Sequence, residues 1–192
     1  IDDNYTIIGK GHFYKGDFVK AEEVFKYLQR KHKEPDSQVA AAAWLARTYM
    51  ELENMPKANS ALLKAVGERD ASDELRADAF LVQADFLLTQ DNFEEAMASI
   101  ERAIPMIKKK RDRARPLFVL AQLKQRYGRK QQAIDLFEDV VKLRTPYEME
   151  FQARMQQALA YDRRGGMSEE VRELFFDMLD DDKNEEYRDQ VF

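Results

Sequence analysis

The chain has 192 residues, of which 44% are hydrophobic and 35% charged, with 7 Gly, 5 Pro and no Cys. An average chain of this length would hold about 23 Gly and Pro residues, so the composition argues against turn-rich sandwiches and barrels and excludes collagen-like, disulfide-framework, thiolate-metal and disordered classes. A net charge of −5 is not the basic footprint of a nucleic-acid-binding protein, and the sequence predicts a protein of long helices.

An alanine followed four residues later by a large apolar side chain recurs along the chain. The anchor positions are spaced by 37, 38, 37 and 38 residues, at Ala21, Ala58, Ala96, Ala133 and Val171. Before each anchor lies another amphipathic segment with a small residue, at Gly9, Ala46, Ala84, Ala121 and Ala158. Each unit is therefore expected to be a helix–turn–helix that cannot bury its apolar faces alone, so that stacked units share one core.

In chain order, the repeats are expected at approximately 2–35, 38–70, 76–110, 113–145 and 148–182, and 184–192 is expected to begin a further helix. Short polar turns at 15–17, 53–56, 90–92, 127–129 and 164–166 join the paired helices. The expected helix N-caps are Asp17, Asn92 and Ser168, with Pro56 in a first helical turn. Gly9 and Gly11 are expected at helix contacts. Because the last segment lacks a partner helix, we expect a single solenoid that is a fragment of a longer array.

This pattern resembles the tetratricopeptide repeat. The positions that carry the resemblance are Gly9, Gly16, Phe18, Ala21, Phe25 and Pro35 in the first copy; Leu45, Ala46, Tyr49, Ala58 and Ala65 in the second; Ala84, Phe93, Ala96 and Ala103 in the third; and Ala121, Gly128, Ala133, Phe137 and Pro146 in the fourth. The resemblance implies an all-α solenoid, a right-handed superhelix of antiparallel helix pairs with about five repeats plus the start of a sixth. Since the family's period is 34, three or four extra residues per unit are expected in longer helices or inter-repeat loops.

No pattern of residues predicts catalysis, a cofactor or a metal. His12 and His32 lie on different helices without an acidic partner at ligand spacing, and a structural role is expected for His12. The glycines around Lys10 lack the strand and the Gly-Lys-Ser/Thr of a phosphate loop. The serines are interpreted as caps or solvent-facing residues, and Asp180–Asp182 lacks the spacing of a calcium loop.

Two further segments bear on contact with nucleic acid or membrane. The basic run Lys108–Arg115 could attract phosphate, but it has no interleaved aromatic residues and falls between repeats three and four, which favours a solvated junction. The longest apolar run, Val39–Ala46, has eight residues, far short of the roughly 20 that span a bilayer.

In the tetratricopeptide family the first helices line a concave groove that binds a peptide or a partner's helix. The resemblance places the groove at Thr6, Lys10 and Phe13; Ala43, Arg47 and Met50; Leu81, Asp85 and Leu88; and Phe118, Gln122, Gln125 and Arg126. No Asn stands at these positions, which argues against a carboxylate clamp for a chaperone's C-terminus. Apolar side chains such as Phe13, Met50 and Phe118 favour a hydrophobic protein segment, although some of them could instead pack against a neighbouring repeat.

A narrower resemblance is carried by Asp2–Phe18, Ala43–Tyr49 and Asp182–Gln190. These stretches resemble the repeat region of tetratricopeptide lipoproteins of the Bacteroidota type IX secretion and gliding-motility system (the PorW/SprE group). That resemblance implies a non-enzymatic scaffold on the periplasmic face of the outer membrane, with ring and translocon proteins as partners. It implies membrane contact through an upstream lipid anchor and no nucleic-acid partner.

Two alternatives stay open. The first is a cytosolic tetratricopeptide adaptor or peptide-sensing regulator that uses the same groove. The second is nucleic-acid binding through the basic run Lys108–Arg115.

Overall fold

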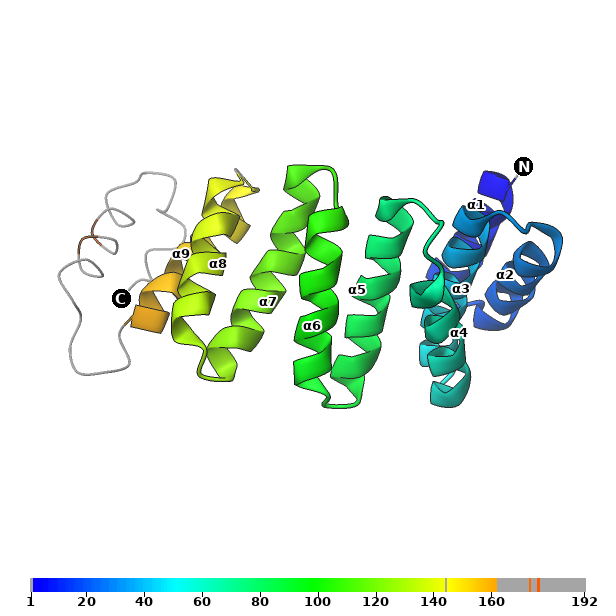
Figure 1. Ribbon diagram of the computed structural model, residues 1–192, viewed down its shortest axis with the longest axis horizontal. Coiled ribbons are helices and arrows are strands. Elements are labelled where there is room, and N and C mark those ends of the chain that lie inside the picture. The colour runs from blue at the N-terminus through cyan, green and yellow to red at the C-terminus, as the bar shows by residue number, and fades with distance from the viewer. Residues whose placement is uncertain (1, 144, 162–172, 174–175, 177–192) are drawn as a thin grey trace. The chain divides into compact units, whose positions relative to one another are not determined.

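The computed structural model describes residues 2–143, 145–161, 173 and 176. Within that part of the chain every regular element is helical, which confirms the predicted all-α class (Figure 1). The α-helices are α1 (Asp2–Tyr14), α2 (Phe18–Lys31), α3 (Pro35–Glu51), α4 (Met55–Gly67), α5 (Asp73–Thr89), α6 (Phe93–Ala103), α7 (Ala114–Arg126), α8 (Lys130–Lys142) and α9 (Tyr147–Tyr161). Two short 3₁₀ helices, η1 (Ile104–Met106) and η2 (Lys110–Arg113), separate α6 from α7.

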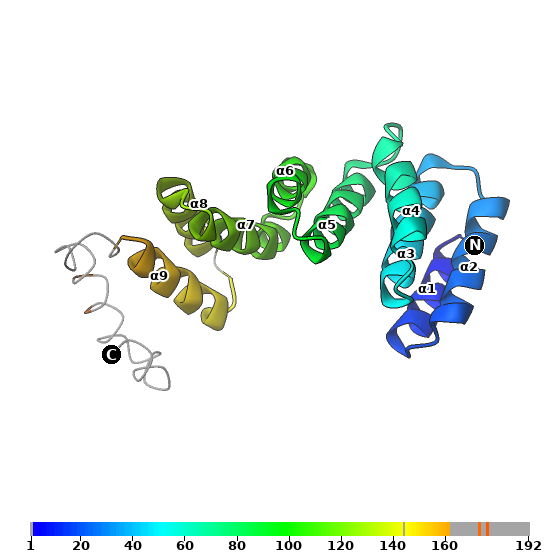
Figure 2. The same cartoon turned by 90° about the horizontal axis from the view of Figure 1, so that it is seen from below.

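The chain divides into two compact units, residues 1–108 and 109–192. The N-terminal unit contains α1 to α6 and η1, and within it α3 packs against α1, α2, α4 and α5. The C-terminal unit contains η2 and α7 to α9, with α8 packed against both α7 and α9. Consecutive helices such as α5 and α6, or α7 and α8, run antiparallel and are joined by a tight turn at one end (Figures 1 and 2). The prediction that all repeats form one solenoid stays a prediction.

The alanine anchors lie in the helix–helix contacts, as the repeat spacing predicts. Ala21, Ala58, Ala96 and Ala133 are completely buried in the second helices of their pairs. The small residues of the first helices are buried as well, at Gly9, Ala46, Ala84, Ala121 and Ala158. Because these side chains are short, two helix backbones can approach closely there, and larger neighbours fill the grooves alongside. Val171 and the rest of the fifth repeat's second helix lie outside the described residues.

In the described part of the chain, four helix pairs close with the same backbone turn. Each turn places one residue at positive φ, namely Gly16 (78°), Glu53 (56°), Asp91 (56°) and Gly128 (76°). The next residue then donates its N–H to the carbonyl five positions back, as Asn54 does to Tyr49 at 2.8 Å and Asn92 to Leu87 at 2.9 Å. This is a Schellman motif. The residue that donates this bond is the N-cap of the second helix of the pair, as Asn54 is for α4 and Asn92 is for α6.

Two of these turns carry a side chain where glycine is preferred, which allows a prediction. Glu53→Gly is expected to stabilise the protein by about 0.5–1 kcal/mol, because removing the left-handed strain outweighs the extra freedom of glycine in the unfolded chain. Gly16→Ala at the equivalent position should destabilise it by about 1 kcal/mol. Urea unfolding followed by circular dichroism measures both, and a destabilised Glu53→Gly variant would contradict the prediction.

The residues beyond the 34-residue period were expected in longer helices or in inter-repeat loops, and the structure has examples of both. α3 and α5 have 17 residues each, whereas α1 and α7 have 13. The junction between the third and fourth pairs is lengthened by η1 and η2.

Several local predictions are corrected or left outside the described residues. Asp17 and Asn92 stand at the N-cap positions of α2 and α6, as predicted, but their side chains make no capping hydrogen bond. Asn54, which was not among the predicted caps, does cap α4 by accepting a hydrogen bond from the Lys57 N–H at 3.2 Å. Gly11 has open space where a Cβ would stand, so it is not a helix contact. Pro56 lies in the first turn of α4, as predicted. Residues 164–166, Ser168, Asp180–Asp182 and 184–192 lie outside the described residues. None of the helices that are described is long and apolar enough to cross a membrane.

Candidate partner-binding groove

The N-terminal unit carries a groove of about 860 Å³ bounded by the first helices of its three pairs. α1, α3 and α5 supply its walls and floor, so the groove lies on the helices that the resemblance predicts. The residues that line it are Thr6, Lys10, Phe13, Tyr14, Asp36, Ser37, Ala40, Trp44, Arg47, Met50, Glu51, Glu74, Leu75, Asp78 and Asp85.

Trp44 forms the floor of this groove and is only 7% exposed. Its ring stacks on Phe25 of α2 at 5.9 Å between centroids and 22° between planes. Phe13 and Tyr14, at the end of α1, meet it edge-on at 5.4 and 5.9 Å. Such offset and edge-to-face contacts are favourable ring geometries. The indole therefore joins α1, α2 and α3 into one rigid surface.

Two cations cover the Trp44 ring. The Lys10 Nζ lies 5.0 Å from the ring centroid and the Arg47 Cζ 4.6 Å from it, both within cation–π range. Arg47 also donates two hydrogen bonds to the Asp78 carboxylate of α5, at 2.8 and 3.1 Å. The pair is partly exposed, so its contribution to stability is about 1 kcal/mol or less, but the bidentate geometry fixes α3 against α5.

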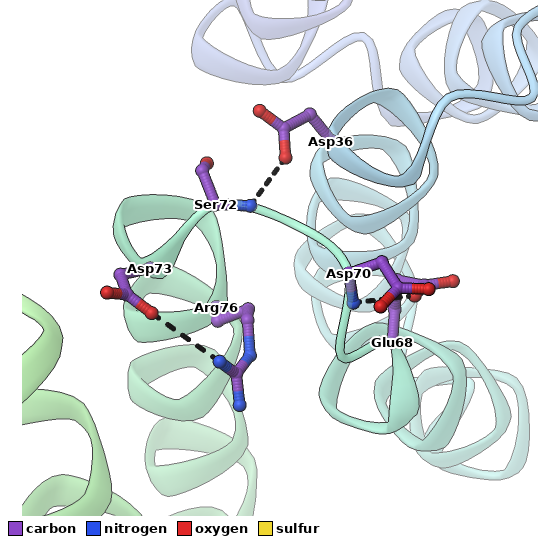
Figure 3. A network of polar contacts seen from close by, with 6 residues as sticks. All are labelled: Asp36, Glu68, Asp70, Ser72, Asp73 and Arg76. Carbon is purple, nitrogen blue, oxygen red and sulfur yellow. Dashed lines mark hydrogen bonds and ion pairs between the residues drawn. The ribbon is translucent and has the colours of Figure 1, made fainter.

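A second contact between α3 and α5 lies at the start of both helices. The Asp36 carboxylate accepts a hydrogen bond from the backbone N–H of Ser72 at 2.6 Å, and Ser72 is the residue before α5 begins (Figure 3). In the same connection the Asp70 N–H donates to Glu68 at 3.0 Å (Figure 3). Asp36 therefore holds the α4–α5 link beside the groove.

An ionic network of the N-terminal unit lies between α2 and α3, outside the groove lining. The Tyr49 hydroxyl donates to Glu22 at 3.1 Å, and the Lys26 Nζ lies 2.5 Å from the same carboxylate. The hydrogen bond from Lys26 lowers the pKa of Glu22, and the same bond raises the pKa of Lys26. Burial raises the pKa of Tyr49, with a further contribution from Glu22. These groups hold α2 against α3, and none of them lines the groove.

The predicted groove residues of the N-terminal unit divide into two sets. Thr6, Lys10, Phe13, Arg47, Met50 and Asp85 line the groove together. Ala43 is buried, Leu81 packs against the small cluster around Phe80, and Leu88 lies outside the lining. Whether the lining residues bind a partner stays a prediction.

Sequence reasoning missed the other lining residues, which are Tyr14, Asp36, Ser37, Ala40, Trp44, Glu51, Glu74, Leu75 and Asp78. A signal for Trp44 exists in the sequence, since Ala40, Trp44 and Arg47 are spaced as one face of a helix.

The predicted groove residues of the C-terminal unit lie on α7. Phe118 is half-buried and packs edge-on against the buried Phe137 of α8 at 5.5 Å, so part of its surface serves the core. Gln122 and Arg126 follow it at helical spacing and are exposed. Gln125 donates to the Gln156 carbonyl of α9 at 3.4 Å. Phe118 thus packs against the second helix of its own pair, whereas the alternative to partner binding was packing against a neighbouring repeat.

The other candidate segments take structural or solvent-facing places. His12 Nδ1 lies 3.6 Å from Asp17, and the ring of His32 lies 6.5 Å from that of Tyr5. Among the side chains that the structure describes, no group of three or more His, Cys, Asp or Glu is placed to hold a metal ion. Within the basic run, Lys108, Lys109, Lys110, Arg111 and Arg115 are exposed. The run occupies the junction between the third and fourth pairs, as predicted.

Comparison with known proteins agrees with this architecture. The crystal structure of MamA aligns with a TM-score of 0.69 and 22% identity over 95% of this chain and 97% of that one. A putative kinesin light chain from Podosopora anserina with nearly identical TPR-like repeats gives 0.68 and 20% over 91% of each chain. BtubC (BKLC) from P. vanneervenii gives 0.69 and 17% over 93% of this chain and 81% of that one. These identities establish the fold alone.

Comparison with curated proteins gives no match. A family model described as tetratricopeptide repeat matches residues 8–74 and 45–113, which together span more than half of the chain. With the repeated helix pairs, the buried alanine anchors and the groove on the first helices, this match shows that the chain belongs to the tetratricopeptide repeat family.

Proposed function

We propose that this chain is a non-enzymatic scaffold that binds a segment of a protein partner in the groove of its N-terminal unit. The observation that carries the proposal is the groove itself, about 860 Å³ in volume with an aromatic floor at Trp44. Tetratricopeptide domains generally bind protein partners and are generally not enzymes. An apolar floor surrounded by a few charges suits a peptide or a helix of another protein.

Peptides selected from a displayed library, followed by titration of the purified protein, test this proposal. Tyr14→Ala combined with Met50→Ala removes two apolar side chains from the lining and is expected to weaken binding at least about tenfold, as loss of buried anchors does. Val19→Ala combined with Leu63→Ala is the matched control, because both side chains are more than 60% exposed and lie outside the lining. Equal weakening by both variants, or by neither, would place the binding surface elsewhere.

We further propose a setting for this scaffold. It would be the periplasmic repeat region of an outer-membrane lipoprotein that links ring and translocon components of the type IX secretion and gliding machinery. The resemblance of the sequences of Asp2–Phe18 and Ala43–Tyr49 to the repeat region of those lipoproteins supports this setting. Membrane attachment would then come from a lipid anchor upstream of the repeats, and the protein would lie on the periplasmic face of the outer membrane.

Co-purification with the ring and translocon proteins tests the setting. Arg47→Glu places a carboxylate beside Asp78 and opens the contact between α3 and α5, so it is expected to reduce both co-purification and secretion. Unchanged secretion in cells that carry Arg47→Glu would count against the setting. The alternative, a cytosolic adaptor or peptide-sensing regulator, predicts a full-length precursor without a lipoprotein signal.

A further inference from the structure

The groove of the N-terminal unit is lined by more negative charge than positive. Five carboxylates line it, at Asp36, Glu51, Glu74, Asp78 and Asp85, against the two cations Lys10 and Arg47. The carboxylates come from both ends of α3 and from α5, where Glu74 and Asp78 are one turn apart and Asp85 follows two turns later. Because they face one concavity, their potentials add, and the groove is expected to attract positive charge.

The two cations are already engaged inside the groove. Both lie over the Trp44 ring, and Arg47 is held by two hydrogen bonds from its guanidinium to Asp78. An anionic ligand would have to take Arg47 from Asp78 and leave that carboxylate without its partner. Such an exchange gains little, since one charged pair replaces another while neighbouring carboxylates repel the ligand.

Helix dipoles do not reverse this preference. The N-termini of α3 and α5 border the groove, and a helix N-terminus attracts anions. Asp36 and Glu74, however, stand in the first turns of these helices and supply that negative charge from the chain itself.

The groove also offers contacts suited to a cation. Glu51 and Glu74 are exposed, and their side chains make no hydrogen bond or ion pair with any residue that the structure describes. Tyr14 is 76% exposed at the groove edge, so that its ring can stack with a guanidinium. Met50 and Leu75 add apolar surface to the same lining.

We propose that the occupant of this groove is a basic segment of a protein partner, with arginine or lysine side chains flanking an apolar one. The inference rests on the proposed function and names the chemistry of the ligand. Arginine or lysine would pair with Glu51 and Glu74, and the apolar side chain would lie on Met50 and Leu75. Steering by the carboxylates would act mainly on the rate of association and would weaken as salt is added.

Trp44 provides the measurement, because it is the only tryptophan of the sequence and lines the groove. Three short synthetic peptides without tryptophan would share the same apolar positions and carry Arg, Gln or Glu at the remaining ones. Titration followed by Trp44 fluorescence is expected to give the Arg peptide about tenfold tighter binding than the Gln peptide at physiological ionic strength. The Glu peptide should bind weakest, and the advantage of the Arg peptide should shrink in high salt.

Charge reversal supplies the matched control. Glu51→Lys combined with Glu74→Lys is expected to abolish the preference for the Arg peptide. Glu23→Lys combined with Glu148→Lys changes the net charge by the same amount at exposed positions outside the groove, and it should keep most of the preference. The inference is overturned if both double variants lose the preference equally, since general charge would then explain it.

The peptide series also separates this inference from the proposed function. Equal binding of the Arg and Gln peptides, or tightest binding of the Glu peptide, would overturn the basic occupant and leave a protein-binding groove. If none of the peptides perturbs Trp44, and library-selected binders are indifferent to Tyr14→Ala with Met50→Ala, both the inference and the groove's proposed role fail.

Discussion

Gly9→Ala is expected to destabilise the N-terminal unit, although alanine normally favours a helix over glycine. A Cβ on Gly9 would lie 2.5 and 2.6 Å from two ring atoms of Phe25, well inside van der Waals contact. Phe25 is completely buried and stacks on Trp44, so its ring has no free space in which to retreat. Overpacking of this kind costs about 1–3 kcal/mol and outweighs the roughly 1 kcal/mol that alanine gains in a helix.

Gly11→Ala is the matched control on the same helix. No atom lies within 4 Å of a Cβ built on Gly11, so the helix preference of alanine acts unopposed and should stabilise the protein by about 0.5 kcal/mol near the helix end. Chemical unfolding of the two variants should therefore give opposite signs. If Gly9→Ala were as stabilising as Gly11→Ala, α1 and α2 would be packed less closely than the structure shows.

A double-mutant cycle identifies the cause of the Gly9 effect. Phe25→Leu removes the ring atoms that the new methyl group would strike and should itself be destabilising. In that background Gly9→Ala is expected to become neutral or stabilising, which gives a coupling free energy of at least about 1 kcal/mol. Coupling near zero would mean that the cost arises elsewhere in the helix.

The fold could be predicted from the sequence because its defining positions recur. The alanine anchors repeat every 37 or 38 residues. This regular spacing alone predicts that they lie in helix contacts, even when the residues that they touch are not known. The turns were located from their polar residues, but the side-chain capping bonds were not. Asp17 lies 3.6 Å from His12 Nδ1 and 3.9 Å from Lys20 Nζ and makes no capping bond. Which of these nearby groups a side chain meets cannot be read from the local sequence.

The face of α3 that forms the groove could not be predicted in the same way. α3 contains an unbroken apolar run, Val39–Ala46, and its core side chains are buried around most of the helix. A helix that is apolar all round has no amphipathic pattern from which to choose a face. Family positions therefore included Arg47 and Met50, which line the groove, together with the buried Ala43, which does not. The same difficulty on α5 placed Leu81 among the groove residues, although it packs on the core.

The partner of Arg47 was beyond sequence reasoning for a different reason. Asp78 lies 31 residues away on the first helix of the next pair, two turns before Asp85 and on the same groove. The pairing of Arg47 with Asp78 depends on how α3 and α5 lie side by side. That placement follows from the packed alanines and not from any charge pattern. The acidic character of the groove likewise arises only where α3 and α5 lie side by side.

Trp44→Ala is expected to have the largest effect of any single substitution in the groove. The indole is in contact with Phe13, Tyr14 and Phe25 and lies beneath Lys10 and Arg47, so its removal leaves a large cavity where α1, α2 and α3 meet. Truncation of a buried tryptophan lowers the free energy of unfolding by about 3–5 kcal/mol. Chemical unfolding followed by circular dichroism should show this as a lower midpoint.

Two further substitutions serve as controls for Trp44→Ala. Trp44→Phe keeps a ring against Phe25 and should cost about 1.5 kcal/mol or less. Leu63→Ala, at a side chain 62% exposed on α4, should change stability by no more than about 0.5 kcal/mol. If Trp44→Ala cost as little as Leu63→Ala, the indole would not be the floor that joins the three helices. A large loss with Trp44→Ala and a small one with Trp44→Phe would show that an aromatic ring at this position holds the three helices together. Because the same ring lines the groove, a substitution that reshapes the groove at its floor would then also weaken the fold.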